Sequence, residues 1–258
     1  MSTTTELPAP PAPARTDRPR RSWWRQAWVA PVLMLAVLFV AVAVPPYLTG
    51  DRSLSRVPTH DQLAWYYPVL VAHIVFGSIA LLTGAFQVWP WFRGRYPVAH
   101  RWMGRSYFWV GAFPAGVGGL LIAPLSSTGL ASQFANTTMA VLWLPISIAG
   151  YRMARQRRFP EHRRWMLRSY ALTTSIVLNR LWGTVMLILF APHLFTAPEV
   201  RGSIIDAGDH RAMTAFGIGN WLSWIVNLLI VEWWLERTDF AKRSRARLAR
   251  RAAATPHP

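Results

Sequence analysis

The sequence predicts an all-α integral membrane protein with six transmembrane helices, and three observations support this fold class. The chain has 258 residues, of which 52% are hydrophobic and only 15% are charged. Six apolar runs each approach the ~20 residues that a helix needs to cross a bilayer. The polar segments between these runs are short, which leaves little chain for a soluble domain.

The six runs divide the chain into a membrane domain and two tails. They lie near residues 28–47, 65–90, 105–126, 136–151, 169–190 and 212–234. They are continuous rather than alternating, which disfavours a β-barrel. We expect a six-helix domain over 27–236, a disordered basic tail over 1–26 that is rich in Pro and Ala, and a basic tail over 237–258. For the first run, a cleaved signal peptide ending at 41–43 is an alternative that leaves the later threading unchanged.

The positive charge is concentrated on alternate segments. The formal net charge is +17, and Lys and Arg number 5 before the first run, 4 in 91–105, 7 in 152–168 and 7 after residue 236. This alternation is the positive-inside bias of membrane proteins, so both termini are expected in the cytoplasm. The basic inner face is expected to bind anionic lipid headgroups, and this placement argues against a nucleic-acid partner.

Several kinds of chemistry have no support in the sequence. The chain has no cysteine, which excludes disulfides and cysteine-ligated zinc or iron–sulfur clusters. No His, Asp and Glu spacing typical of a metal site, no phosphate loop and no nucleophile motif is present. No metal site is therefore predicted.

One arginine-rich phrase occurs twice. RYPVAHRWMGRSY (95–107) and RFPEHRRWMLRSY (158–170) align without a gap at an offset of 63, and eight of their thirteen residues are identical. The repeat suggests a tandem duplication in which the second and third helices were copied as the fourth and fifth. Convergence under the same topological demand is the alternative.

The repeated phrase has three possible roles. It could simply hold each inner loop in the cytoplasm. It could bind a phosphate or carboxylate through arginines at the two helix starts; the candidates are Arg101, Arg105, Arg163 and Arg168. It could also bind haem iron through His100 and His162, although the alignment places these histidines one residue out of register, about 100° around a helix.

Polar residues within the apolar runs indicate a second candidate site. His73 and Arg180 are expected at a similar depth in the outer half of the bilayer, and Asn220 lies near the same level. Ionisable groups at membrane depth are costly and often functional. Gln87, near the inner end of the second run, is a candidate hydrogen-bond donor to a quinone. For each residue a structural role is the alternative: snorkelling for Arg180 and helix–helix hydrogen bonding for His73.

The segment HIVFGSIALLTGAFQ (73–87), followed by HRWMGRSY and HRRWMLRSYALT, resembles a bacterial multi-pass membrane family known as domain-of-unknown-function family 2306. The resemblance covers roughly residues 65–190. It implies an integral membrane protein of unassigned function, and it supplies no catalytic residues. From the six predicted helices, we expect the bacterial cytoplasmic (inner) membrane as the location.

These observations favour a membrane redox module that binds b-type haem or quinone. The candidate haem ligands are His73, His100 and His162, with Arg180 as a partner for an anionic group. One alternative is a non-enzymatic small-molecule carrier or sensor whose site is an outer-leaflet pocket formed by His73 and Arg180. A structural partner of another membrane protein is a further alternative.

Overall fold

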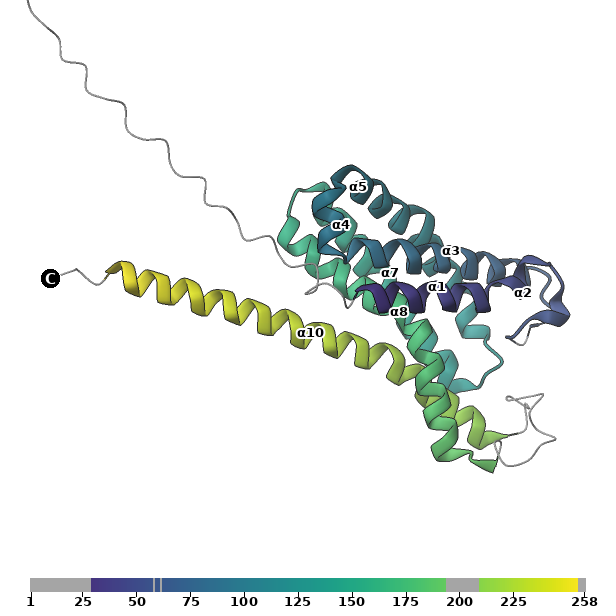
Figure 1. Ribbon diagram of the computed structural model, residues 1–258. Helices are drawn as coiled ribbons and strands as arrows, with labels where there is room; N and C mark the ends of the chain where they lie inside the picture. The colour runs from purple at the N-terminus through teal and green to yellow at the C-terminus, as the bar shows by residue number, and fades with distance from the viewer. Residues whose placement is uncertain (1–28, 58, 61, 194–208, 255–258) are drawn as a thin grey trace, which may run out of the picture.

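The computed structural model describes all residues except 1–28, 58, 61, 194–208 and 255–258, and the described chain is helical (Figure 1). The first half contains α1 (Val29–Ala43), α2 (Pro45–Leu48), η2 (Arg52–Leu54), α3 (Tyr66–Gln87), α4 (Pro90–Arg95), α5 (Pro97–Ser106), η3 (Tyr107–Ala112), α6 (Phe113–Ile122) and η4 (Ala123–Leu125). The second half contains α7 (Leu130–Arg155), α8 (Phe159–Phe190) and α10 (His210–Ala254). The prediction of an all-α fold is confirmed.

Four segments in the described part of the chain are long and apolar enough to span a membrane. They are α3, the continuous segment Pro97–Leu125, α8 and the first 32 residues of α10 (His210–Ala241). α1 is apolar but has only 15 residues, because two prolines at 45 and 46 follow its end. α7 has 26 residues, but it contains polar side chains such as Gln133 and Asn136. The structure therefore shows four candidate spans and a shorter apolar helix, where the sequence analysis predicted six spans.

The segment from α5 to α6 is a single helical path with a π-helical turn, η3, at its centre. Pro114 follows this turn and lacks the N–H that would bond the carbonyl of Val110, so the regular bonding pattern is interrupted there. Gly111 lies in the same turn, where a Cβ atom would come within 2.9 Å of the Ala80 backbone on α3. α3 and the Pro97–Leu125 segment therefore approach each other closely at Gly111.

α8 and α10 form the most extended helix pair, and their outer halves share an apolar cluster around Leu187 and Ala215. Gly219 allows this pair to pack tightly, because its added Cβ atom would lie 2.8 Å from the Gly183 Cα atom. The two glycines of the stretch FGIGNW (216–221) therefore serve close helix packing.

α10 continues to Ala254, so most of the segment interpreted as a basic tail is helical. Figure 1 shows this end of α10 extending past the other helices. At its start, Asp209 accepts hydrogen bonds from the backbone N–H groups of Arg211 at 2.9 Å and Ala212 at 3.1 Å. The Ala212 N–H and the His193 side chain hold the pKa of the Asp209 carboxyl below its usual value. The predicted tail over 1–26 lies outside the described residues.

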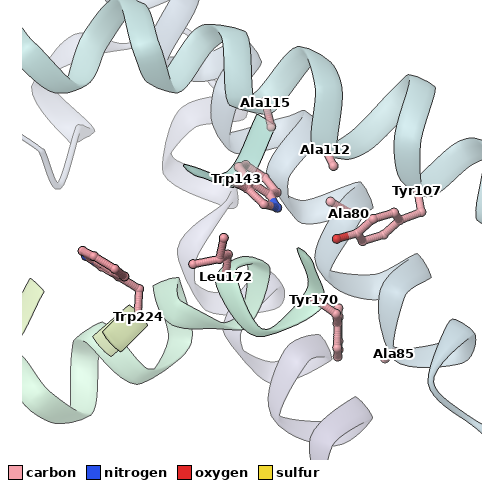
Figure 2. Packing of buried hydrophobic residues seen from close by; sticks show 9 residues of the cluster. All are labelled: Ala80, Ala85, Tyr107, Ala112, Ala115, Trp143, Tyr170, Leu172 and Trp224. Carbon is pink, nitrogen blue, oxygen red and sulfur yellow. The ribbon is translucent and has the colours of Figure 1, made fainter. Parts of the chain in front are cut away.

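The central core joins helices from both halves of the chain (Figure 2). Its buried members are Ala80, Ala85, Tyr107, Ala112, Ala115, Trp143, Tyr170, Leu172 and Trp224. Figure 2 shows the Tyr107 ring extending from its helix into the interior of the bundle. Both tyrosines of this core are the last residues of the repeated phrase.

Candidate functional site

A chain of buried hydroxyl groups joins the two copies of the repeated phrase. The Tyr107 hydroxyl lies 2.6 Å from Ser169 Oγ and 2.9 Å from Thr173 Oγ1, both on α8. Ser169 Oγ also lies 2.7 Å from Ser147 Oγ on α7. Tyr107, Ser147 and Ser169 are each 0% exposed. The end of the first copy is therefore hydrogen-bonded directly to the end of the second.

The tyrosines of the two copies converge on one glycine of α3. A Cβ atom at Gly84 would lie 2.4 Å from the Tyr170 ring and 3.0 Å from the Tyr107 ring. Only a residue without a side chain leaves room for both rings here. The Tyr170 hydroxyl donates to the Leu81 carbonyl at 3.4 Å, a long hydrogen bond.

His100 and His162 lie at the same level of the bundle. Each precedes its contact residue, Tyr107 or Ser169, by seven residues, which is two helical turns and returns to nearly the same helix face. Tyr107 and Ser169 are 62 residues apart, and the two histidines have the same separation. Residues of the two copies that face each other are thus 62 positions apart, whereas residues that align in sequence are 63 apart. His100 lies within electrostatic range of His162.

The two imidazole rings have different hydrogen-bond states. His162 Nδ1 donates to the Gly150 carbonyl at the end of α7, at 2.8 Å. In the neutral ring this bond places the proton on Nδ1 and leaves the lone pair on Nε2. His100 Nδ1 is buried and has no hydrogen-bond partner within the described chain. A buried ring nitrogen without a partner is energetically costly.

Gln87 contacts the first turns of α5. Its Nε2 donates to the His100 carbonyl at 3.1 Å. Its Oε1 packs beside Gly104, where an added Cβ atom would lie 3.1 Å away. The side chain predicted to bind a quinone therefore supports the backbone of the residue that carries the unpartnered imidazole.

The predicted outer residues are not brought into one pocket. His73 Nδ1 donates to the Ala115 carbonyl of α6 at 2.7 Å. Arg180 is exposed on α8, within electrostatic range of Tyr47 and Arg56. Asn220 is 1% exposed on α10, and neither polar atom of its amide has a hydrogen-bond partner among the described residues. Among the residues that the structure describes, no hydrogen bond or ion pair joins any two of these three side chains.

Four carboxylates of the connecting segments are possible partners for Arg180 by their place in the sequence. Asp61, Glu199 and Asp206 lie outside the described residues. Asp209 is bound to His193 at 2.7 Å.

The four arginines of the predicted anion site have different surroundings. Arg168 Nη2 donates to Glu232 Oε2 of α10 at 2.8 Å. The Arg163 guanidinium lies 5.1 Å from the centre of the Trp234 ring. The Arg105 guanidinium stacks on Trp102, and Arg101 lies within electrostatic range of His100. The second copy is thus packed against α10, and the first copy is not.

Sequence reasoning missed the hydroxyl chain, although its signal was present. Tyr107, Ser169 and Tyr170 belong to the repeated phrase, which was interpreted through its arginines and histidines. Ser147 and Thr173 carry no such signal, because isolated hydroxyl residues are common in apolar helices and often bond their own backbone.

The several long apolar helices and the polar groups buried between them define a multi-pass membrane protein of helical-bundle type. The chain belongs to the family described as "Predicted membrane protein (DUF2306)", which matches residues 70–205, more than half of its length. No curated protein and no solved structure matches the chain.

Proposed function

We propose that the chain is a membrane redox module in which His100 and His162 are the two axial ligands of one b-type haem. The proposal rests on the equivalent positions of these residues, each seven residues before the Tyr107–Ser169 contact, and on their lying within electrostatic range of each other. One imidazole has a buried nitrogen without a partner, and the other is oriented by a backbone carbonyl. Metal-ligating histidines typically donate their second ring N–H to such a carbonyl, which fixes the ring orientation.

Haem of the b type fits the residues present. Covalent attachment through thioethers is excluded because the chain has no cysteine. Bis-histidine ligation between helices is an established arrangement in membrane and bundle proteins. When bound, the haem would supply a one-electron redox centre near the inner end of the bundle.

The surrounding residues support the two ligands. The Gly150 carbonyl orients His162, and Gln87 holds the His100 backbone. The hydrogen bond between Tyr107 and Ser169 lies two helical turns after the two histidines and holds their helices at a fixed spacing. Arg93 and Arg101 lie within electrostatic range of His100 and offer positive charge for propionate groups.

Two of the other sequence-based functions receive less support. Because one of the two Gln87 N–H groups is already bonded to the His100 carbonyl and the amide is held against α5, we favour haem over quinone at this level. The carrier or sensor hypothesis needs a shared pocket for His73 and Arg180, and no contact in the described chain joins them. His73 lies fourteen residues from Gln87 on α3, about 20 Å along the helix axis, so it cannot ligate the same iron.

The test is the absorption spectrum of the full-length protein, produced with added haem precursor and purified in detergent. We expect a Soret band in the unaltered protein, and its loss in His100→Ala and in His162→Ala. His210→Ala, an exposed histidine, and His73→Gln should both retain the band. A colourless protein after haem reconstitution, or a band that survives both inner substitutions, would overturn the assignment.

We further propose that the domain threads the bacterial cytoplasmic membrane six times, with both termini in the cytoplasm. α1 and α7 then complete the four candidate spans. α7 is long enough, at about 39 Å, and α1 at about 22 Å requires local thinning or the adjoining residues. The alternation of basic segments supports this topology. Residues 27–236 form the membrane domain in this proposal, with basic segments at both ends.

A further inference from the structure

The two copies of the repeated phrase differ in how their arginines are neutralised. Three arginines recur at equivalent positions of the alignment, and the pairs are Arg95 and Arg158, Arg101 and Arg164, and Arg105 and Arg168. The repeat therefore provides an internal comparison of the same side chains in two settings.

In the second copy every one of these arginines binds a carboxylate. Arg158 pairs with Glu161 at 3.0 Å. Arg164 pairs with Asp239 at 2.9 Å. Arg168 pairs with Glu232, whose Oε2 lies 2.8 Å from the Arg168 Nη2. Two of the three carboxylates come from α10, which packs along α8.

In the first copy none of the three arginines has a carboxylate partner among the described residues. The sequence contains no Asp or Glu from Gln62 to Pro160. The aromatic contact is nevertheless the same in both copies. The Arg105 guanidinium lies 4.9 Å from the Trp102 ring, and its counterpart Arg168 lies 5.0 Å from the Trp165 ring. The two copies thus share the arginine–tryptophan contact, and they differ in whether a carboxylate binds the arginines.

The first copy also contains an open, mostly apolar pocket. It has a volume of about 460 Å³ and is lined by Arg95, Tyr96, Pro97, Val98, Ala99 and Trp102. Val98 is 56% exposed and Trp102 is 62% exposed. Apolar and aromatic surface beside unpaired guanidinium groups suits an amphiphile with an anionic head.

We infer that α4 and α5 bind the phosphate head of an anionic phospholipid, which neutralises Arg95, Arg101 and Arg105. The phosphate takes the place that carboxylates occupy in the second copy, and Val98 and Trp102 contact the glycerol and upper acyl region. Trp residues favour this interfacial depth. The inference does not rest on the proposed haem function, because it uses neither histidine. Arg101 alone is shared with the proposed haem site, so the Arg105 variants test the lipid site separately.

The test is native mass spectrometry of the full-length protein with added phosphatidylglycerol, and with phosphatidylcholine as the zwitterionic comparison. We expect preferential binding of phosphatidylglycerol. Arg101→Gln and Arg105→Gln should each weaken it about fivefold, since a basic residue near an anionic headgroup contributes about that factor. Arg105→Lys keeps the charge and should retain most of the binding.

The second copy supplies matched controls. Arg164→Gln and Arg168→Gln should leave phosphatidylglycerol binding unchanged and lower the unfolding temperature, because they break internal ion pairs. Equal weakening in both copies would show non-specific attraction and overturn the inference, as would unchanged binding in the Arg101 and Arg105 variants. Displacement of the bound lipid by inorganic phosphate alone would assign the site to a soluble anion instead.

Discussion

At the residue scale, the hydroxyl chain around Tyr107 has a fixed direction. The Thr173 hydroxyl donates its single proton to the Ser169 carbonyl at 2.9 Å. It must therefore accept from Tyr107, which in turn must accept from Ser169. Ser147 is then the donor to Ser169. Each hydroxyl has only one proton to donate. The backbone carbonyl at one end therefore determines which group donates and which accepts in every hydrogen bond of the hydroxyl chain.

The first prediction concerns the Tyr107 hydroxyl. Tyr107→Phe removes two buried hydrogen bonds and leaves Ser169 and Thr173 with fewer partners. We expect a loss of about 1 kcal/mol in the free energy of unfolding, since hydrogen bonds between membrane helices contribute on this scale. Thermal or denaturant unfolding in detergent measures the change.

Tyr96→Phe is the matched control, because its ring is 46% exposed. It should have a small effect on unfolding. If both variants were equally stable, the hydroxyl chain would not contribute to holding η3 against α8.

The sequence pointed to the two inner histidines as candidate ligands, but it did not predict their positions relative to each other. His100 and His162 stand out because each copy of the repeated phrase contains one histidine. The alignment at offset 63 argued against a shared face, because it compares each helix with its copy. Which residues of two parallel helices meet depends on how far one helix is shifted along the other. An alignment of the sequence with itself does not contain this shift. The Tyr107–Ser169 hydrogen bond shows that residues 62 apart face each other.

At the element scale, glycines determine how closely the helices approach. Gly111 faces the Ala80 backbone on α3, and Gly219 faces Gly183 on α8. At both positions the neighbouring atoms belong to the backbone, so they cannot move aside as a flexible side chain would. The small residues in these stretches could be recognised from the sequence, but their partners could not, because the partners lie far away along the chain.

The second prediction tests the α8–α10 contact. Gly219→Ala places a methyl group 2.8 Å from the Gly183 Cα atom and must separate the two helices. Overpacking of this kind costs about 1–3 kcal/mol, and we expect a lower unfolding temperature. Gly94→Ala is the control, since no atom lies within 4 Å of its added Cβ atom.

An unchanged unfolding temperature in Gly219→Ala would mean that α8 and α10 can shift apart without loss. A decrease of the same size in Gly94→Ala would attribute the effect to substitution of a glycine in general.

At the scale of the whole molecule, sequence patterning predicted the helical class and most helix positions. It differed from the structure in counting spans. The proline pair at 45 and 46 shortens the first helix, and the polar residues of α7 lower its hydropathy, so these two runs are not among the four candidate spans. Neither effect is visible in a count of apolar runs, because such a count ignores where a helix ends and which face carries the polar groups.

The third prediction concerns the six-span topology. The chain has no cysteine, so single cysteines can be introduced without removing native ones. Leu54→Cys, in η2, should react with a membrane-impermeant maleimide in intact cells. Gln156→Cys, between α7 and α8, should react only after the membrane is opened.

Both positions are exposed in the structure, so a difference in labelling reports the side of the membrane. Labelling of both positions in intact cells would exclude the proposed orientation of α7.

The length of α10 has a mechanical consequence. From Trp221 to Ala254 the sequence contains neither glycine nor proline, and the helix is uninterrupted over its 45 residues. This glycine-free part, about 51 Å long, has no hinge at which an imposed tilt could be absorbed. A small rotation of its end beside Trp221 would therefore swing the opposite end through several ångströms.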